Sequence, residues 1–286
     1  MMKQIYLTGF SDEICEDFDI QLQVVSQFGL KYIEIRGVDG KNIASLSEEE
    51  LEAVKKKLKE KEIAVSAIGS PIGKISIQDD FEPHFEQLKK VVNTAKQLGT
   101  QYIRMFSFYI PKGEAAENYK AEVMERLSRF VEYAKKEEVV LLHENEKGIY
   151  GDTPKRCVEI LENFYGDNFK AIFDFANFVE CGEDTKKAYA MLKPYVTYIH
   201  IKDARKEGNV IVPAGDGDGN VAEILADLKT EKYSGFLSLE PHLTNFGGLQ
   251  ALEYEAKERA EEMDAQTAWA LALRSLKSIL WDIDWR

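Results

Sequence analysis

Four ionisable residues stand in four successive apolar segments in the second half of the chain. Glu144 ends VVLLHE, Asp174 lies in AIFDFA, His200 in YIHIK and Glu240 in FLSLEP. A charge in an apolar segment is unfavourable unless an opposite charge compensates it. An ion pair would explain one such residue, but three acids and one imidazole in successive segments indicate a shared cation. The pattern therefore predicts that these four residues bind one divalent metal ion.

The residue types limit which metal this is. Three carboxylates and one ring nitrogen suit Mn²⁺, Mg²⁺, Co²⁺, Fe²⁺ or Zn²⁺, and the ligand types alone do not choose among them. The set contains no thiolate, which argues against a structural zinc site.

The segments that must position these residues follow a regular alternation. Eight short runs rich in Ile, Val, Tyr and Phe each precede a stretch of helical period. The runs are 5–10, 32–36, 64–69, 102–108, 139–144, 171–176, 198–202 and 236–241. Such alternation predicts a parallel sheet. Eight units that close on themselves form a (β/α)8 TIM barrel, whose catalytic groups stand at the C-terminal ends of the strands.

Local signals agree with this division of the chain. Ser47 and Glu50 form a capping-box pattern, and Thr153-Pro154 supplies an N-cap followed by a proline. Gly29 and Gly99 stand where helices should end. The alternative is an open doubly wound sheet, but no Gly-x-Gly-x-x-Gly turn follows the first run and no Pro/Gly-rich linker divides the chain. We therefore expect one TIM barrel domain over residues 1–286.

The last part of the chain is longer than one barrel helix requires. The stretch 249–280 predicts an extended C-terminal helical segment. Its acidic part, 253–265, is interpreted as a solvated helical face, with a contact between subunits as the alternative.

Composition excludes several classes of protein. A net charge of −13 without a basic run argues against nucleic acid as a partner. No apolar run approaches the roughly 20 residues of a membrane span, and the first ten residues do not resemble a signal peptide. Three widely spaced cysteines, Cys15, Cys157 and Cys181, argue against disulfides and favour the cytoplasm. A homo-oligomer, most simply a dimer, is expected only from base rates.

The four motifs LLHENE, FDFAN, YIHIKDA and LSLEPH resemble the xylose isomerase-like TIM barrels, and so does the Gly-rich VPAGDGDGN (212–220). The resemblance spans nearly the whole chain. The family includes sugar isomerases and epimerases, inosose dehydratases and endonuclease IV-type repair enzymes. It implies that Glu144, Asp174, His200 and Glu240 hold the metal ion.

Two positions depart from that family. Many members have His three residues after the Asp and two residues after the first Glu, where this chain has Asn177 and Glu146. A chain with only four histidines does not suit the multi-zinc cluster of the repair enzymes. Asn177 also weakens the analogy to free-ketose epimerases.

The resemblance implies a mechanism. The metal ion would act as a Lewis acid on a carbonyl and its neighbouring hydroxyl, with Glu144 and Glu240 as acid and base on opposite faces. The leading prediction is thus a metal-dependent isomerase or epimerase of a sugar or polyol derivative. The alternatives are an inosose-type dehydratase at the same site and a sugar-binding barrel without turnover.

Further polar residues are candidates for holding the substrate. They are Lys202, Arg36, Glu34, Arg104, Lys74 and Asn177. Salt bridges to the surrounding acids are the alternative for the cations, and Lys202 is favoured because it shares strand parity with His200. His143 has the opposite parity to Glu144, which predicts a core histidine. His242 lies past the last strand and fits either role.

Overall fold

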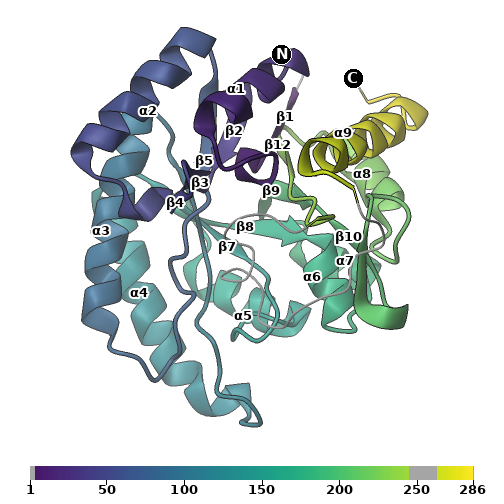
Figure 1. Ribbon diagram of the computed structural model, residues 1–286. Coiled ribbons are helices and arrows are strands. Elements are labelled where there is room, and N and C mark those ends of the chain that lie inside the picture. The colour runs from purple at the N-terminus through teal and green to yellow at the C-terminus, as the bar shows by residue number, and fades with distance from the viewer. Residues whose placement is uncertain (1–3, 245–262, 286) are drawn as a thin grey trace.

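The computed structural model describes residues 4–244 and 263–285. These residues form a ring of eight parallel strands surrounded by helices (Figure 1). The strands are β1 (Ile5–Gly9), β2 (Tyr32–Ile35), β5 (Ala64–Ile68), β6 (Tyr102–Met105), β7 (Val140–Glu144), β8 (Phe169–Asp174), β9 (Val196–Ile201) and β12 (Gly235–Leu239). Their order is β1-β12-β9-β8-β7-β6-β5-β2. A parallel bridge from Phe10 to Glu34 joins the two ends of this order, so the predicted barrel is confirmed.

The helices that cover the barrel are α1 (Phe18–Gln27), α2 (Glu48–Lys61), α3 (Phe81–Leu98), α4 (Lys120–Lys136), α5 (Pro154–Phe164), α6 (Phe175–Glu180), α7 (Thr185–Leu192), α8 (Val221–Thr230) and α9 (Ala265–Asp282). Short 3-10 turns lie at Ser11–Glu13, Ile43–Ser45, Ala116–Tyr119 and Glu207–Asn209. Two small hairpins, β3 (Gly37–Val38) with β4 (Lys41–Asn42) and β10 (Asp203–Arg205) with β11 (Val210–Val212), follow β2 and β9. Among the described residues no helix is long and apolar enough to cross a membrane.

The local signals in the sequence act as predicted. Ser47 and Glu50 form a complete capping box at the start of α2. Thr153 caps α5, and Pro154 is the first residue of that helix. Gly99 ends α3 in the left-handed conformation at φ 73°, which a glycine adopts without steric penalty. These caps determine where α2 and α5 begin and where α3 ends.

Most of the predicted strands end one to three residues earlier than expected, and two of them show the difference most clearly. The run 102–108 is a strand only as far as Met105. The run 171–176 is a strand from Phe169 to Asp174, and its last two residues begin α6 instead. The cause is local, because the Asp174 carboxylate accepts a hydrogen bond from the Asn177 backbone N–H at 2.8 Å and so caps that helix.

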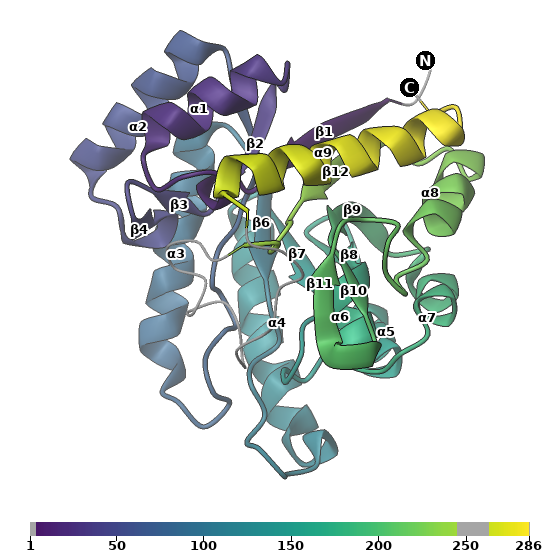
Figure 2. The same ribbon diagram turned by 45° about the vertical axis from the view of Figure 1, so that its right-hand side comes forward.

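The described part of the C-terminal segment is α9. Figure 2 shows this helix lying alongside β1 and β12, next to α8. Its Trp269 is buried and donates its indole N–H to the Phe10 carbonyl at 3.1 Å. Residues 253–262 of the predicted acidic face lie outside the described residues. The helix α9 thus forms part of the outer layer of the barrel, over the junction of β1 and β12.

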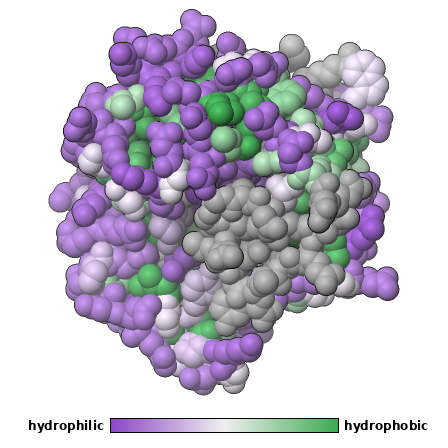
Figure 3. Space-filling view, viewed as in Figure 1, coloured by the Kyte–Doolittle hydropathy of each residue, from purple (hydrophilic) through white to green (hydrophobic). Residues whose placement is uncertain are grey.

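The polar side chains at the barrel mouth lie above an apolar floor. Inward-facing Ala67, Val140, Leu142, Ile172 and Tyr198 form a separate cluster inside the barrel. A larger apolar cluster fills the space between the strands and the helices. The helices at the left of Figure 3, α2 to α4, present mainly hydrophilic residues outward, as expected of amphipathic barrel helices.

Candidate metal centre

The four predicted ligands meet at one end of the barrel. Glu144 ends β7, Asp174 ends β8, His200 lies near the end of β9, and Glu240 directly follows β12. One ligand atom from each residue lies within 4.8 Å of the others, and none of the four is more than 3% exposed. The strands β7, β8, β9 and β12 are successive neighbours in the sheet. Their parallel register therefore brings the four side chains to one level.

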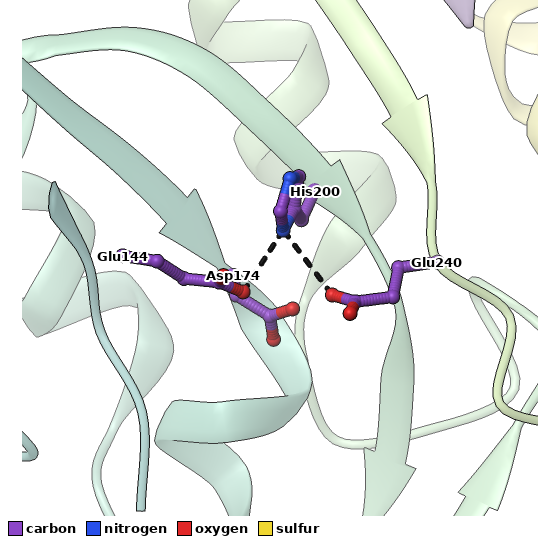
Figure 4. A group of neighbouring side chains, drawn as sticks. All are labelled: Glu144, Asp174, His200 and Glu240. Atoms are coloured by element: carbon purple, nitrogen blue, oxygen red, sulfur yellow. Dashed lines mark hydrogen bonds and ion pairs between the residues drawn. The ribbon is translucent and has the colours of Figure 1, made fainter. Parts of the chain in front are cut away.

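The imidazole of His200 is the centre of this group. Its Nδ1 lies 2.9 Å from Glu144 Oε1 and 3.2 Å from Glu240 Oε2. Figure 4 shows the two glutamates reaching this nitrogen from the left and from the right of the view, with Asp174 between them. Asp174 Oδ2 accepts no hydrogen bond from the described residues, although Lys202 Nζ lies 3.1 Å away.

The electrostatics of the cluster favour a cation. Burial raises the pKa of Asp174 to about 8; Lys202 opposes this effect, and the charges of Glu240 and Glu144 reinforce it. Burial also opposes ionisation of Glu240, but Lys202 and His200 hold its pKa well below the ordinary value. Three carboxylates and one imidazole nitrogen so close together match the donor set of a divalent ion. The four residues therefore fit a divalent metal ion.

The other nitrogen of His200 contacts a carboxylate behind the ring. His200 Nε2 lies 3.1 Å from Glu34 Oε2, and the Ser238 hydroxyl donates to the same oxygen at 2.6 Å. Burial alone would lower the pKa of His200, but Glu144 and Glu34 raise it well above 6.5. Burial likewise opposes ionisation of Glu34, whose pKa is nevertheless lowered, mainly by His200. Glu34 thus lies against a predicted ligand.

Two arginines also reach the cluster. The Arg36 guanidinium donates to both oxygens of Asp12, at 2.8 and 3.1 Å, and lies 3.3 Å from Glu240 Oε1. The Arg104 Nη1 atom lies 3.3 Å from Glu144 Oε2 and 3.4 Å from Glu240 Oε1. Both arginines are buried. The shorter bonds of Arg36 tie it to the loop after β1, whereas Arg104 contacts the predicted ligands directly.

The remaining substrate-binding candidates differ in position. Lys202 Nζ lies 3.1 Å from Asp174 Oδ2 and 3.4 Å from Glu240 Oε2. Asn177 Nδ2 donates to the Asn145 carbonyl at 2.9 Å and lies 3.5 Å from Glu144 Oε1.

Lys74 lies farther out. Its Nζ pairs with Glu146 Oε2 at 2.9 Å and lies 4.4 Å from the centre of the Phe106 ring. Glu146 occupies the second position where the resemblance leads one to expect histidine. The structure therefore brings Lys202, Arg36, Arg104 and Asn177 into contact with the four predicted metal ligands. It places Lys74 in a separate ion pair.

Sequence reasoning missed the residues that follow β1. Glu13 Oε2 accepts the His242 backbone N–H at 2.8 Å, and Glu13 Oε1 accepts Arg36 Nη2 at 3.1 Å. His242 Nε2 lies 3.4 Å from Glu240 Oε1. Burial raises the pKa of Glu13 to about 8. The signal was available, because Asp12 and Glu13 lie in the loop after the first strand, and a barrel places its functional groups in such loops.

His143 lies away from the metal cluster, as its strand parity predicts. Its Nε2 is 3.0 Å from Ser107 Oγ, and its ring packs against Phe169. Burial lowers the pKa of His143 to about 3. The structure therefore places this residue in the core.

The Gly-rich turn after β9 is organised by Asp203. Its carboxylate accepts backbone N–H groups from Gly215 at 2.9 Å, Gly217 at 3.1 Å and Gly219 at 2.9 Å. A Cβ atom at Gly217 would lie 2.3 Å from Asp203 Oδ1, so only glycine fits this approach. These hydrogen bonds anchor the turn, which precedes α8, to the start of β10.

Comparison with known proteins agrees with the fold. The chain matches the family described as xylose isomerase-like TIM barrel over residues 22–278, and it belongs to that family. 3-Dehydroshikimate dehydratase of Bacillus anthracis is 24% identical over 221 residues, 74% of this chain and 78% of that protein. Inosose dehydratase of Mesomycoplasma hyopneumoniae is 26% identical over 195 residues, 57% of this chain and 64% of that protein.

Solved structures share the barrel. D-Allulose 3-epimerase from Methylomonas sp. superposes with a TM-score of 0.75 at 17% identity, covering 97% of this chain and 99% of that one. The IOLI protein, solved with a binding zinc atom, has a TM-score of 0.74 at 16% identity and the same coverage. Curated relatives of this chain thus include two dehydratases, and the solved structures that share its fold include an epimerase and a protein solved with zinc.

Proposed function

We propose that this protein is a metal-dependent isomerase or epimerase of a sugar or sugar derivative. The observation that supports this best is that Glu144 and Glu240 reach the Nδ1 side of His200 from two different strand ends, with Asp174 between them (Figure 4). A substrate held between them presents one face to each carboxylate. Two carboxylates so arranged are suited to remove a proton from one face and return one to the other.

Different residues of the chain would bind the metal ion, transfer the proton and stabilise charge on the substrate. Glu144, Asp174, His200 and Glu240 would hold one divalent ion, which when bound polarises a carbonyl and acidifies the neighbouring C–H. Glu144 and Glu240 then serve as base and acid. Lys202 and Arg104, which contact Asp174, Glu144 and Glu240, stabilise negative charge that develops on the substrate oxygen.

A dehydratase is the second candidate. Two curated relatives are named as dehydratases, of 3-dehydroshikimate and of inosose. Removal of the same proton, followed by loss of a hydroxyl group from the next carbon instead of reprotonation, gives elimination of water. Both reactions use a small polyhydroxylated carbonyl compound and the same acid–base pair.

Deuterium exchange tests both candidates. The protein is incubated in D₂O with Mn²⁺ and a panel of ketoses and inososes, and products are followed by NMR. An isomerase or epimerase introduces solvent deuterium next to the carbonyl, whereas a dehydratase yields a product lacking one water. Stoichiometric Mn²⁺ binding without exchange or conversion of any compound would instead identify a sugar-binding barrel without turnover and contradict the proposal. The expected cytoplasmic location and homo-oligomer stay predictions.

A further inference from the structure

We propose that Glu34 is a positioning residue that fixes the orientation and the proton of the metal ligand His200, and that it does not bind substrate. The inference rests on the proposed function, because it assumes that His200 ligates a metal ion. Glu34 comes from β2, outside the four neighbouring strands that supply the ligands. It is fully buried.

The two ring nitrogens of His200 face different carboxylates. Nδ1 faces the carboxylates of Glu144 and Glu240 at 2.9 and 3.2 Å. Nε2 faces the two oxygens of Glu34 at 3.3 and 3.1 Å. A neutral imidazole that ligates through one nitrogen carries its proton on the other. A carboxylate at Nε2 therefore holds the proton there and leaves the Nδ1 lone pair facing the cluster.

Neighbouring side chains hold both Glu34 and the imidazole ring of His200 in place. Ser238 donates to Glu34 Oε2 at 2.6 Å, which fixes the carboxylate from a third strand. The rings of Phe10 and Tyr198 pack edge-on against the imidazole, with centroids 5.3 and 5.8 Å away. The two rings fix the plane of the imidazole, and Glu34 determines that its proton lies on Nε2.

The position of Glu34 behind the imidazole ring does not suit substrate binding. Glu34 meets the side of the ring opposite to Glu144 and Glu240. A substrate chelated at the metal ion would approach from the Nδ1 side and would have His200 between itself and Glu34. The position of Glu34 thus suits an effect on metal affinity more than one on substrate affinity.

Metal titration of the full chain tests the inference. Mn²⁺ affinity is measured by calorimetry for the wild type, Glu34→Gln, Glu34→Ala and the control Thr8→Val. Loss of a carboxylate behind a ligating histidine typically weakens metal binding about 10- to 100-fold, and we expect this for Glu34→Ala. Glu34→Gln keeps an acceptor and the side-chain volume, so we expect a smaller loss. Thr8 is equally buried but contacts Ser66 instead of His200, so Thr8→Val should bind Mn²⁺ as the wild type does.

Two further measurements separate positioning from a general structural effect. The visible spectrum of bound Co²⁺ should change in Glu34→Gln and stay unchanged in Thr8→Val. In a double-mutant cycle, Glu34→Gln should add little to the loss caused by His200→Ala, because both changes act on the same ligand.

The outcomes are distinct. Wild-type Mn²⁺ affinity in folded Glu34→Gln and Glu34→Ala, together with a raised KM, would overturn the positioning role and assign Glu34 to the substrate. If Glu34→Ala does not fold, Glu34→Gln alone decides by the same criteria. A wild-type chain that binds no Mn²⁺, Co²⁺ or Zn²⁺ would overturn the proposed function and this inference with it.

Discussion

Glu240 is the most heavily contacted carboxylate of the centre. His200, Lys202, Arg104 and Arg36 all lie within 3.4 Å of its two oxygens. Burial opposes its negative charge, yet Lys202 and His200 lower its pKa well below the usual range. Glu240 is therefore ionised near neutral pH and suited both to hold a cation and to exchange a proton.

Replacing Glu240 by glutamine tests this dual role. The change Glu240→Gln keeps the volume but removes the charge and the acid–base group. We expect kcat to fall by about 10²- to 10⁴-fold, together with weaker Mn²⁺ binding, measured by deuterium exchange and calorimetry. The exposed Glu231→Gln is the control, because Glu231 pairs with Lys193 on the surface. Wild-type exchange in Glu240→Gln would rule out the assigned role.

Lys202 gives a second prediction for a single residue. Its ammonium lies 3.1 Å from Asp174 and 3.4 Å from Glu240, so it repels a metal ion while attracting a polar substrate. Lys202→Met keeps the length of the side chain and removes the charge. We expect KM to rise about tenfold or more while Mn²⁺ affinity is retained or increased. Loss of Mn²⁺ binding in this variant would show that Lys202 supports the metal site instead.

The elements around the centre are joined by side chains that bind backbone. Asp174 ends β8 and caps α6 through Asn177, which couples a predicted ligand to the start of a helix. The Asp203 carboxylate holds the loop after β9 in place, because it accepts the backbone N–H groups of three glycines and of Ala204. The strand ends are therefore held rigidly, which a metal site requires.

Asp203→Ala should destabilise the protein. Removing this acceptor leaves buried or half-buried backbone N–H groups without a partner, at about 1–3 kcal/mol for each one that water cannot reach. We expect the free energy of unfolding to fall by about 2–4 kcal/mol in urea denaturation. Asp216→Ala in the same turn is the control, because Asp216 is exposed and surface changes stay within about 0.5 kcal/mol. Equal stability of the two variants would contradict the anchoring role of Asp203.

The stability of the whole molecule should depend on pH through a buried histidine outside the centre. His84 on α3 is buried, and its Nε2 accepts the Gly73 N–H at 2.7 Å. Burial lowers its pKa from 6.5 to about 4. Below pH 6.5 the unfolded chain therefore binds a proton that the folded chain takes up only near pH 4. The stabilisation is present above pH 6.5 and is lost progressively as the pH falls toward 4.

Comparison with His84→Gln isolates this effect. From pH 7 to pH 4 the free energy of unfolding of the variant should fall by up to about 3 kcal/mol less than that of the wild type. Glutamine keeps an acceptor for Gly73, so the fold is retained. Urea denaturation across this pH range measures the difference, and parallel curves for the two proteins would contradict it.

The sequence by itself determined the barrel and the four residues of the centre. Hydrophobic period separates strands from helices, and parity along each strand decides which residues face inward. Glu144, Asp174, His200 and Glu240 could therefore be assigned to one level before any distance was known. The same parity correctly placed His143 in the core, beside Ser107.

Tertiary structure decided what those residues contact. Glu34 and His200 are far apart in the sequence, and they meet because the barrel closes between β1 and β2. The approach of Glu13 to His242 depends on the pairing of β1, the first strand of the chain, with β12, the last. Period and parity describe one segment at a time, whereas contacts across a ring depend on register and curvature. The sequence therefore identifies the groups at the barrel mouth, and only the closed barrel shows Glu34 behind the histidine.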